Sequence, residues 1–134
     1  MSTHLSLSER VFELPATAAA AGLARRELAA MPGLGGELGY KALLMASELI
    51  AVYVADIEPS PSATLRLSIR VTPDRVRIEV GGREPGVSPD ALLHSRETPS
   101  LGGYGLRIVE RMADAWGIEG AHDTMIWFEL ARPA

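Results

Sequence analysis

The sequence predicts an α+β fold, a two-layer sandwich in which helices cover one face of a mostly antiparallel sheet. Two stretches near the middle of the chain, 64–71 and 75–80, alternate apolar with polar residues, as half-buried antiparallel strands do. Two helix-like stretches precede these strands and a third follows them. The expected order is therefore β-α-α-β-β-loop-α-β, with room for one more strand near the end. A length of 134 residues fits a single domain spanning 1–134.

The N-terminal part is expected to form one strand and two helices. Arg10 to Leu14 is short and rich in alternating apolar residues, which indicates an edge strand ending at Pro15. Ala16 to Met31 consists largely of good helix formers and stops before Pro32-Gly33. A second helix is predicted from Glu37 to Asp56, because apolar residues recur there at three- and four-residue steps. These residues are Leu38, Ala42, Met45, Leu49 and Val52.

The middle of the chain is expected to form a β-hairpin. Its strands are Thr64 to Val71 and Arg75 to Val80, and Thr72-Pro73-Asp74 is a plausible turn between them. Period-two alternation places Val76, Ile78 and Val80 on one side of the second strand, so we expect these residues in the core.

The C-terminal part is expected to contain a long loop, a helix and a strand. Gly81 to Gly103 is rich in Gly, Pro and Ser, and it is too long for a loop without a role in a compact domain. Leu106 to Trp116 is predicted as a helix and Met125 to Leu130 as the closing strand. We expect Trp116 and Trp127 to be core or edge aromatics rather than recognition residues.

Charge and composition argue against several functions. Thirteen basic residues against 17 acidic ones give a net charge of −4. Nucleic-acid-binding domains usually carry a basic excess, so no direct nucleic-acid partner is expected. Cysteine is absent and the 3 histidines are widely spaced, so no metal site is expected. Because no apolar run could span a membrane and the start is polar, we expect a cytoplasmic protein.

A glycine-rich motif, Gly102-Gly103-Tyr104-Gly105-Leu106, opens the third expected helix. Glycines immediately before a helix let backbone amides turn toward an anion, and the helix N-terminus adds partial positive charge. The same glycines also suit a tight turn into a helix that binds nothing. The pattern alone leaves both interpretations open.

Four segments in succession carry a resemblance to a known family. They are the run Leu43 to Ile50, the strand Val76 to Val80 with the following Pro85-Gly86, the G-x-G-L motif at Gly103, and the strand Thr124 to Leu130. From about residue 10 to residue 130, the chain resembles the small GHKL-type (histidine kinase-like) ATPase domains of the anti-sigma factor/serine kinase family of Gram-positive bacteria.

This resemblance implies a regulator of transcription. Members of the family bind a sigma factor and keep it from RNA polymerase, and they bind a small anti-anti-sigma partner of the STAS type. Many phosphorylate that partner on a serine with ATP and magnesium. The resemblance also implies homodimers, and partner contacts from the first helix, where Arg25 and Arg26 lie. The alternative for this arginine pair is an ordinary solvated helix face.

At the metal position the chain departs from the family pattern. In the family, a Glu on the second helix acts as general base, and an Asn four residues later holds the magnesium. Glu48 matches the base, but Val52 stands at the Asn position. A valine offers a hard cation no oxygen ligand. Without a metal site, Glu48 is interpreted as a helix-face carboxylate with a structural or partner-binding role.

At the adenine position the chain departs as well. The family places an Asp at a strand end, where it accepts a hydrogen bond from the adenine amino group, and the matching residue here is Gly82. Of the following glycine pair, Gly86 is kept, and Glu84 replaces the other glycine beyond the expected strand end. The phosphate-facing motif is intact at Gly103, Gly105 and Leu106.

These departures favour an interaction protein over an enzyme. We expect an anti-sigma factor that sequesters an alternative sigma factor and is released by a STAS-type partner, with neither ATP nor magnesium as a cofactor. One alternative is an active ATP-dependent serine kinase that phosphorylates the anti-anti-sigma protein, with Glu48 as base. Another is a regulator that uses this fold for a partner other than a sigma factor.

Overall fold

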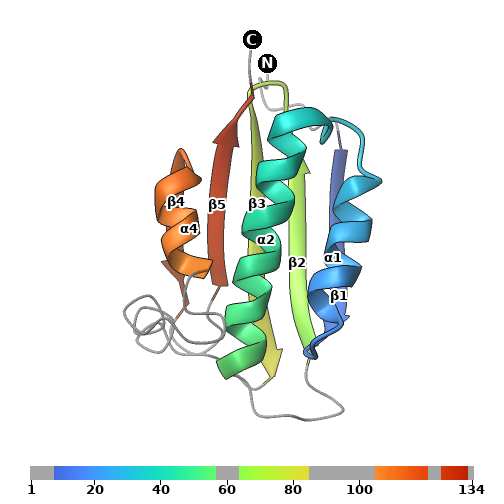
Figure 1. Cartoon of the computed structure of the whole chain (residues 1–134), viewed down its shortest axis with the longest axis vertical. Helices are drawn as coiled ribbons and strands as arrows, with labels where there is room; N and C mark the ends of the chain where they lie inside the picture. Colours follow the sequence, from blue (N-terminus) through green and yellow to red (C-terminus); the bar gives the residue numbers. More distant parts are fainter. Residues whose placement is uncertain (1–7, 57–63, 85–104, 121–124, 133–134) are drawn as a thin grey trace.

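A five-stranded antiparallel sheet forms one layer of the described chain, and three helices cover one of its faces (Figure 1). The computed structural model describes residues 8–56, 64–84, 105–120 and 125–132. The predicted α+β class, with helices on one face of an antiparallel sheet, is confirmed. The elements are β1 (Ser8–Pro15), α1 (Ala20–Ala29), α2 (Gly36–Asp56), β2 (Thr64–Val71), β3 (Arg75–Glu84), α4 (Gly105–Met112), β4 (Ala115–Glu119) and β5 (Met125–Ala131).

The strands lie in the order β1-β2-β3-β5-β4, and every neighbouring pair is antiparallel. β1 and β4 are therefore the two edges of the sheet. The helix layer consists of α1, α2 and α4, with α2 between the other two (Figure 1). None of the helices in the described ranges combines the length and the apolar character that crossing a bilayer requires.

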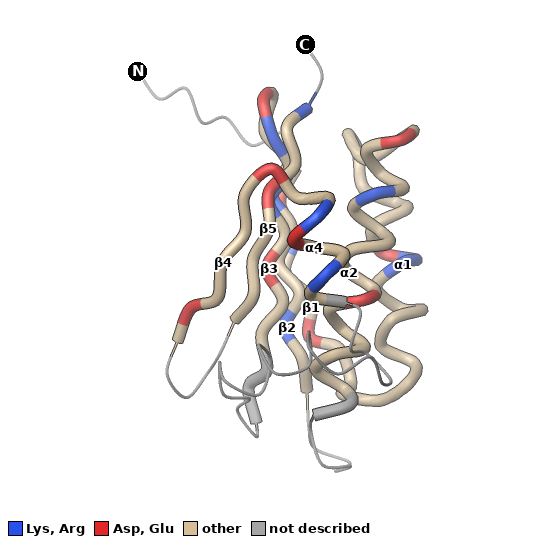
Figure 2. Tube along the Cα trace, turned by 60° about the vertical axis from the view of Figure 1, so that its left-hand side comes forward, with Lys and Arg blue, Asp and Glu red and all other residues tan. Residues whose placement is uncertain are grey.

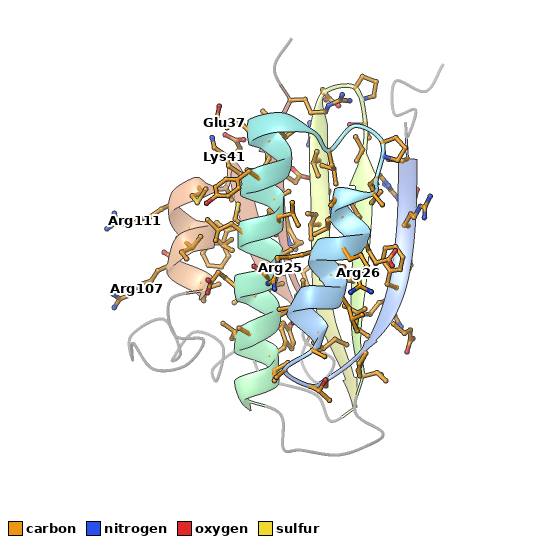
Figure 3. All side chains as sticks on the ribbon, turned by 45° about the vertical axis from the view of Figure 1, so that its right-hand side comes forward. Arg25, Arg26, Glu37, Lys41, Arg107 and Arg111 are labelled. Atoms are coloured by element: carbon orange, nitrogen blue, oxygen red, sulfur yellow. The ribbon has the colours of Figure 1, made fainter. Side chains whose placement is uncertain are left out.

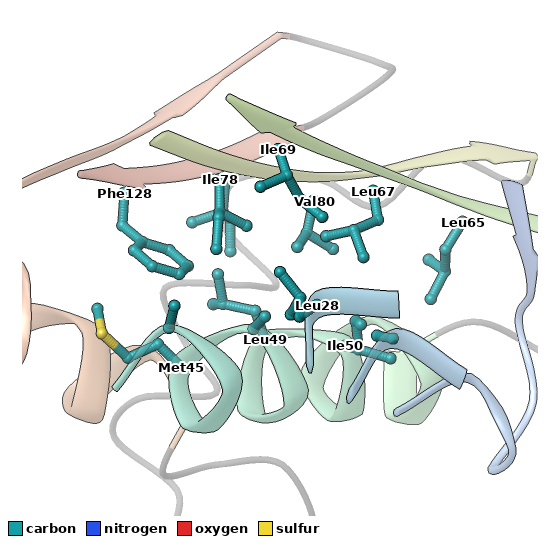
Figure 4. Packing of buried hydrophobic residues seen from close by; sticks show 14 of the residues in the cluster. Leu28, Met45, Leu49, Ile50, Leu65, Leu67, Ile69, Ile78, Val80 and Phe128 are labelled. Carbon is teal, nitrogen blue, oxygen red and sulfur yellow. The ribbon is translucent and has the colours of Figure 1, made fainter. Parts of the chain in front are cut away.

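The core lies between α2 and the inner face of the sheet (Figure 4). Ile78 of β3 and Phe128 of β5 point toward Met45 and Leu49 of α2, and all four side chains are fully buried. Val76 and Val80 are fully buried as well, so the predicted core positions of β3 are confirmed. Burying a side chain of this size stabilises the fold by roughly 1.5–3 kcal/mol.

The predicted hairpin turn joins β2 to β3. The backbone N–H of Thr72 donates to the carbonyl of Arg75 (2.9 Å), and the hydroxyl of Thr72 donates to the carboxylate of Asp74 (2.7 Å). This hydroxyl lowers the pKa of Asp74 below its usual value. Thr72 is the buried side chain of this turn, and its hydroxyl is hydrogen-bonded within the turn itself.

Two helices are shorter than the sequence predicts. α1 begins at Ala20 rather than Ala16, because the chain first turns after β1, with the N–H of Ala20 donating to the carbonyl of Thr17 (3.0 Å). The prediction of a helix through Trp116 is wrong, since α4 ends at Met112 and Trp116 belongs to β4.

Hydrogen bonds from both the side chain and the backbone of Asp114 explain the early end of α4. Its carboxylate accepts a hydrogen bond from the N–H of Ala131 (2.6 Å), and its own N–H donates to the carbonyl of Glu129 (2.9 Å). These bonds tie the residues after α4 to β5, and the chain continues along β5 as a strand.

Gly117 of β4 provides a test of this strand pairing. Gly117 is opposite Trp127, and a Cβ at Gly117 would lie 2.8 Å from the indole Nε1. Replacing a strand glycine by alanine is ordinarily favourable by roughly 0.5–1 kcal/mol. Here we expect Gly117→Ala to lower the free energy of unfolding by about 1–3 kcal/mol in urea titrations, because the methyl group overpacks against the indole. In a Trp127→Leu background the penalty should disappear, and an equal penalty there would contradict the pairing.

Candidate functional site

Glu48 and Val52 lie one turn apart on α2, but their surroundings differ. Glu48 is half-buried, whereas Val52 is 1% exposed. Val52 belongs to the same buried cluster as Leu106 and Val109 of α4, the helix in contact with α2. The position that would hold a magnesium ligand in the resembled family is thus an apolar packing position, with neither an oxygen atom nor access to solvent.

The candidate adenine position lies inside a strand. Gly82 pairs with Leu65 of β2, and Glu84 pairs with Thr64 across a register shift. We expected the strand to end at Val80 with Glu84 beyond it, and this prediction is wrong. β3 continues to Glu84 because β2 supplies pairing partners as far back as Thr64. As a glycine, Gly82 has no side-chain acceptor for an adenine amino group.

The glycine motif is described only from Gly105 onward. Gly105 is the first residue of α4, and Leu106 is completely buried, so Leu106 anchors the helix in the core. Gly86 and Gly103 lie outside the described residues. The same holds for most of the expected loop Gly81 to Gly103, of which residues 81–84 belong to β3.

Arg25 and Arg26 are neighbours on α1, and both are exposed on the outward side of the helix layer (Figure 3). Within the described ranges, neither guanidinium forms an ion pair with a carboxylate. Arg107 and Arg111 project from α4 on the far side of α2 (Figure 3). The arginine pair of α1 therefore presents two positive charges to solvent at a position separate from the core.

A cluster on the open face of the sheet was not predicted from the sequence. Arg77 donates from Nε to Glu79 (2.8 Å) and from Nη1 to Glu129 (3.1 Å), and its guanidinium lies 4.3 Å from the ring centre of Trp127. Burial opposes the charge of Arg77, but the hydrogen bonds to Glu79 and Glu129 outweigh it and raise the pKa of Arg77. These residues occupy outward positions of strands in which outward and buried residues alternate. The alternation within one strand does not show which strands are neighbours in the sheet. Figure 2 shows charged residues on both layers of the molecule.

A groove of about 340 Å³ on this open face is lined by three arginines, which at first suggests an anion site. Each of them already contacts carboxylates. Arg75 pairs with Glu129 (3.1 Å), Arg77 pairs with the same carboxylate (3.1 Å), and Arg70 pairs with Glu9 (3.4 Å). A phosphate would have to displace these partners, so the groove is a poor candidate for the triphosphate of a nucleotide. In the described ranges, no group of three or more His, Cys, Asp or Glu residues is arranged to hold a metal ion.

The sequence matches no protein-family model, and comparison with curated proteins also finds no match. The functional inference therefore rests on the resemblance carried by the motifs of this chain and on the geometry of its residues.

The burial of Val52 can be tested by substitution. We expect Val52→Asn to lower the free energy of unfolding by at least about 1–3 kcal/mol, because the side-chain amide would be buried without hydrogen-bond partners. Val54→Asn is the matched control, since Val54 lies on the same helix and is partly exposed. Denaturant titration of both variants measures the difference. Equal losses would mean that residue 52 faces a solvated cleft, as a metal ligand does.

Proposed function

We propose that this chain is an anti-sigma factor of GHKL-like fold whose nucleotide site is degenerate. It sequesters an alternative sigma factor, and a STAS-type anti-anti-sigma protein releases that factor by competing for the chain. Support comes from the succession of family-like motifs and from a two-layer α+β fold that is compatible with this family. The proposal requires no phosphorylation of the partner by this chain.

The observation that carries the proposed loss of ATP chemistry is the buried valine on α2. Val52 provides no oxygen for magnesium, so the charge of a triphosphate would lack its usual compensation. At Gly82 the adenine amino group would be left without its hydrogen bond, at a cost of roughly 1–3 kcal/mol. Each 1.4 kcal/mol is a factor of about ten in affinity, so the two losses together weaken nucleotide binding by orders of magnitude. In this proposal, Val52 and Gly82 do not supply the ligands that ATP with magnesium needs.

Partner binding needs a surface that exists without a ligand. Arg25 and Arg26 offer such a surface, because they are exposed, adjacent and unpaired within the described chain. The whole chain carries a net charge of −4, so a pair of arginines on one helix is a local feature that an acidic partner surface can recognise. The sigma factor and its STAS competitor would then use overlapping contacts on α1.

Titration with nucleotide separates the proposal from its main alternative. We expect isothermal calorimetry of the chain with ATP and magnesium to give no saturable heat up to millimolar nucleotide. Saturable binding in the micromolar range would instead favour an active serine kinase that uses Glu48 as base. Phosphorylation of a STAS partner by the unmodified chain, and its loss in a Glu48→Gln variant that still bound nucleotide, would then establish that alternative.

Charge reversal on α1 tests the partner surface. We expect Arg25→Glu/Arg26→Glu to weaken binding to a co-purifying sigma factor by roughly tenfold or more, because two attractive contacts become repulsive. Arg107→Glu/Arg111→Glu is the matched control, since it also reverses two exposed arginines, here on α4, and should leave affinity unchanged. Affinity capture from a native extract followed by biolayer interferometry provides both measurements. Recovery of no sigma subunit, or equal weakening by both variants, would contradict the proposal.

A further inference from the structure

Gly22, in the first turn of α1, is a glycine that the fold itself does not require. Its φ is outside the left-handed region, and among the described residues a Cβ here would have only Nη2 of Arg25 within 4 Å beyond the helix's own backbone, at 3.7 Å. Gly39 of α2 is different, because a Cβ there would collide with the carbonyl of Leu34. Alanine at a compatible position is more stable than glycine, since its unfolded chain has less entropy to lose. The packing of the described chain therefore gives no reason for glycine at position 22.

The missing side chain of Gly22 leaves the backbone of α1 open near its boundary with α2. Arg25 extends over this position, and Figure 3 shows Arg25 on the side of α1 that is nearer to α2. α1 packs against α2 (Figure 1). The outward side of α2 carries Leu44, Ser47 and Ala51, which share one helix face and are half-buried. Gly22 and Arg25 together with these three residues form what we call the α1–α2 surface.

The α1–α2 surface fits a helix that carries a carboxylate on one flank. Leu44, Ser47 and Ala51 recur at three- and four-residue steps, so side chains of another helix can pack between them. At Gly22 that helix can approach the backbone of α1 closely, because no side chain intervenes. Arg25 forms no ion pair with a carboxylate of the described chain, and its positive charge favours a carboxylate on the incoming helix.

A second copy of this chain does not match the same surface. Two copies that met through Gly22 would bring Arg25 and Arg26 of both into one contact, whereas Glu27 is the sole carboxylate of α1. Like charges in a small contact weaken association. The homodimers that the resemblance implies can use other faces of the fold, such as the edges of the sheet.

We infer that the α1–α2 surface binds an amphipathic helix of a partner protein, which packs against Gly22 and places a carboxylate beside Arg25. The inference rests on the proposed function for the choice of α1 as a partner surface, and it adds the secondary structure and the direction of approach of the partner. A larger side chain at position 22 would hold the partner helix away from α1. Binding thus accounts for a glycine that folding does not need.

A helix-forming peptide tests the inference on the full-length chain. The probe is fluorescein-labelled Glu-Leu-Ala-Gln-Leu-Ala-Gln-Glu-Leu-Ala-Gln-Leu-Ala-Gln-Glu, whose glutamates flank a face of leucine and alanine, and its binding is followed by fluorescence anisotropy. We expect saturable binding that is roughly tenfold weaker when lysine replaces every glutamate. Arg25→Glu should reverse this preference. Arg26→Glu should alter it much less, because Arg26 lies on the other side of α1 (Figure 3).

Substitution of Gly22 separates binding from stability. We expect Gly22→Ala to raise the midpoint of urea unfolding and yet to weaken peptide binding several-fold, because the methyl group stabilises α1 but holds the peptide away from it. Gly22→Leu should weaken binding by roughly tenfold or more. Ala30→Leu is the matched control, since it adds a leucine at the exposed end of the same helix, about two turns away, and should leave affinity unchanged.

The inference is overturned by absence of saturable binding, by equal binding of the lysine peptide, or by undiminished binding to Gly22→Leu. A chain dimer that Gly22→Leu dissociates in analytical ultracentrifugation would overturn it as well, in favour of a second copy on this surface. Failure of the proposed function is distinct, because recovery of no sigma subunit from a native extract leaves the peptide measurements unchanged.

Discussion

The structure depends on the packing of α2 against the apolar face of β2, β3 and β5. Met45 and Leu49 on one side meet Ile78 and Phe128 on the other, and none of these side chains is exposed (Figure 4). A sheet of alternating residues has one apolar face, which must be covered to be stable in water. α2 covers the centre of this face, and α1 and α4 flank it, so the positions available to polar groups on α2 are restricted.

This restriction connects the core to the proposed loss of nucleotide chemistry. A helix that holds a metal ligand must leave that residue open to solvent or to the ion, whereas Val52 contributes to the buried cluster with Leu106. An apolar side chain at this position gains burial free energy and gives up an oxygen ligand. Glu48, one turn earlier, remains half-buried and is compatible with a contact to a partner protein. At position 52, α2 thus carries a side chain that stabilises the core, where the resembled family carries a residue needed for catalysis.

The charged residues of the helix layer and those of the open face of the sheet differ in their partners. Arg25 and Arg26 are on the helix layer and form no ion pair within the described chain, whereas on the open face of the sheet Arg77 donates to both Glu79 and Glu129. Because the charges of that face are largely satisfied internally, the polar partners it offers to other molecules are few.

The sequence by itself determined the fold class, the bounds of β2, the hairpin turn and the inward face of β3, because local periodicity and turn chemistry encode them. It also identified Val52 and Gly82 as the positions at which the chain departs from the resembled family. Tertiary structure decided that Trp116 belongs to a strand, that β3 runs on to Glu84, and that Arg77 meets Trp127. These outcomes depend on which strands are neighbours. Alternation in one segment reports which side chains share a face, whereas pairing joins residues far apart in the chain and is set by the packing of the whole domain.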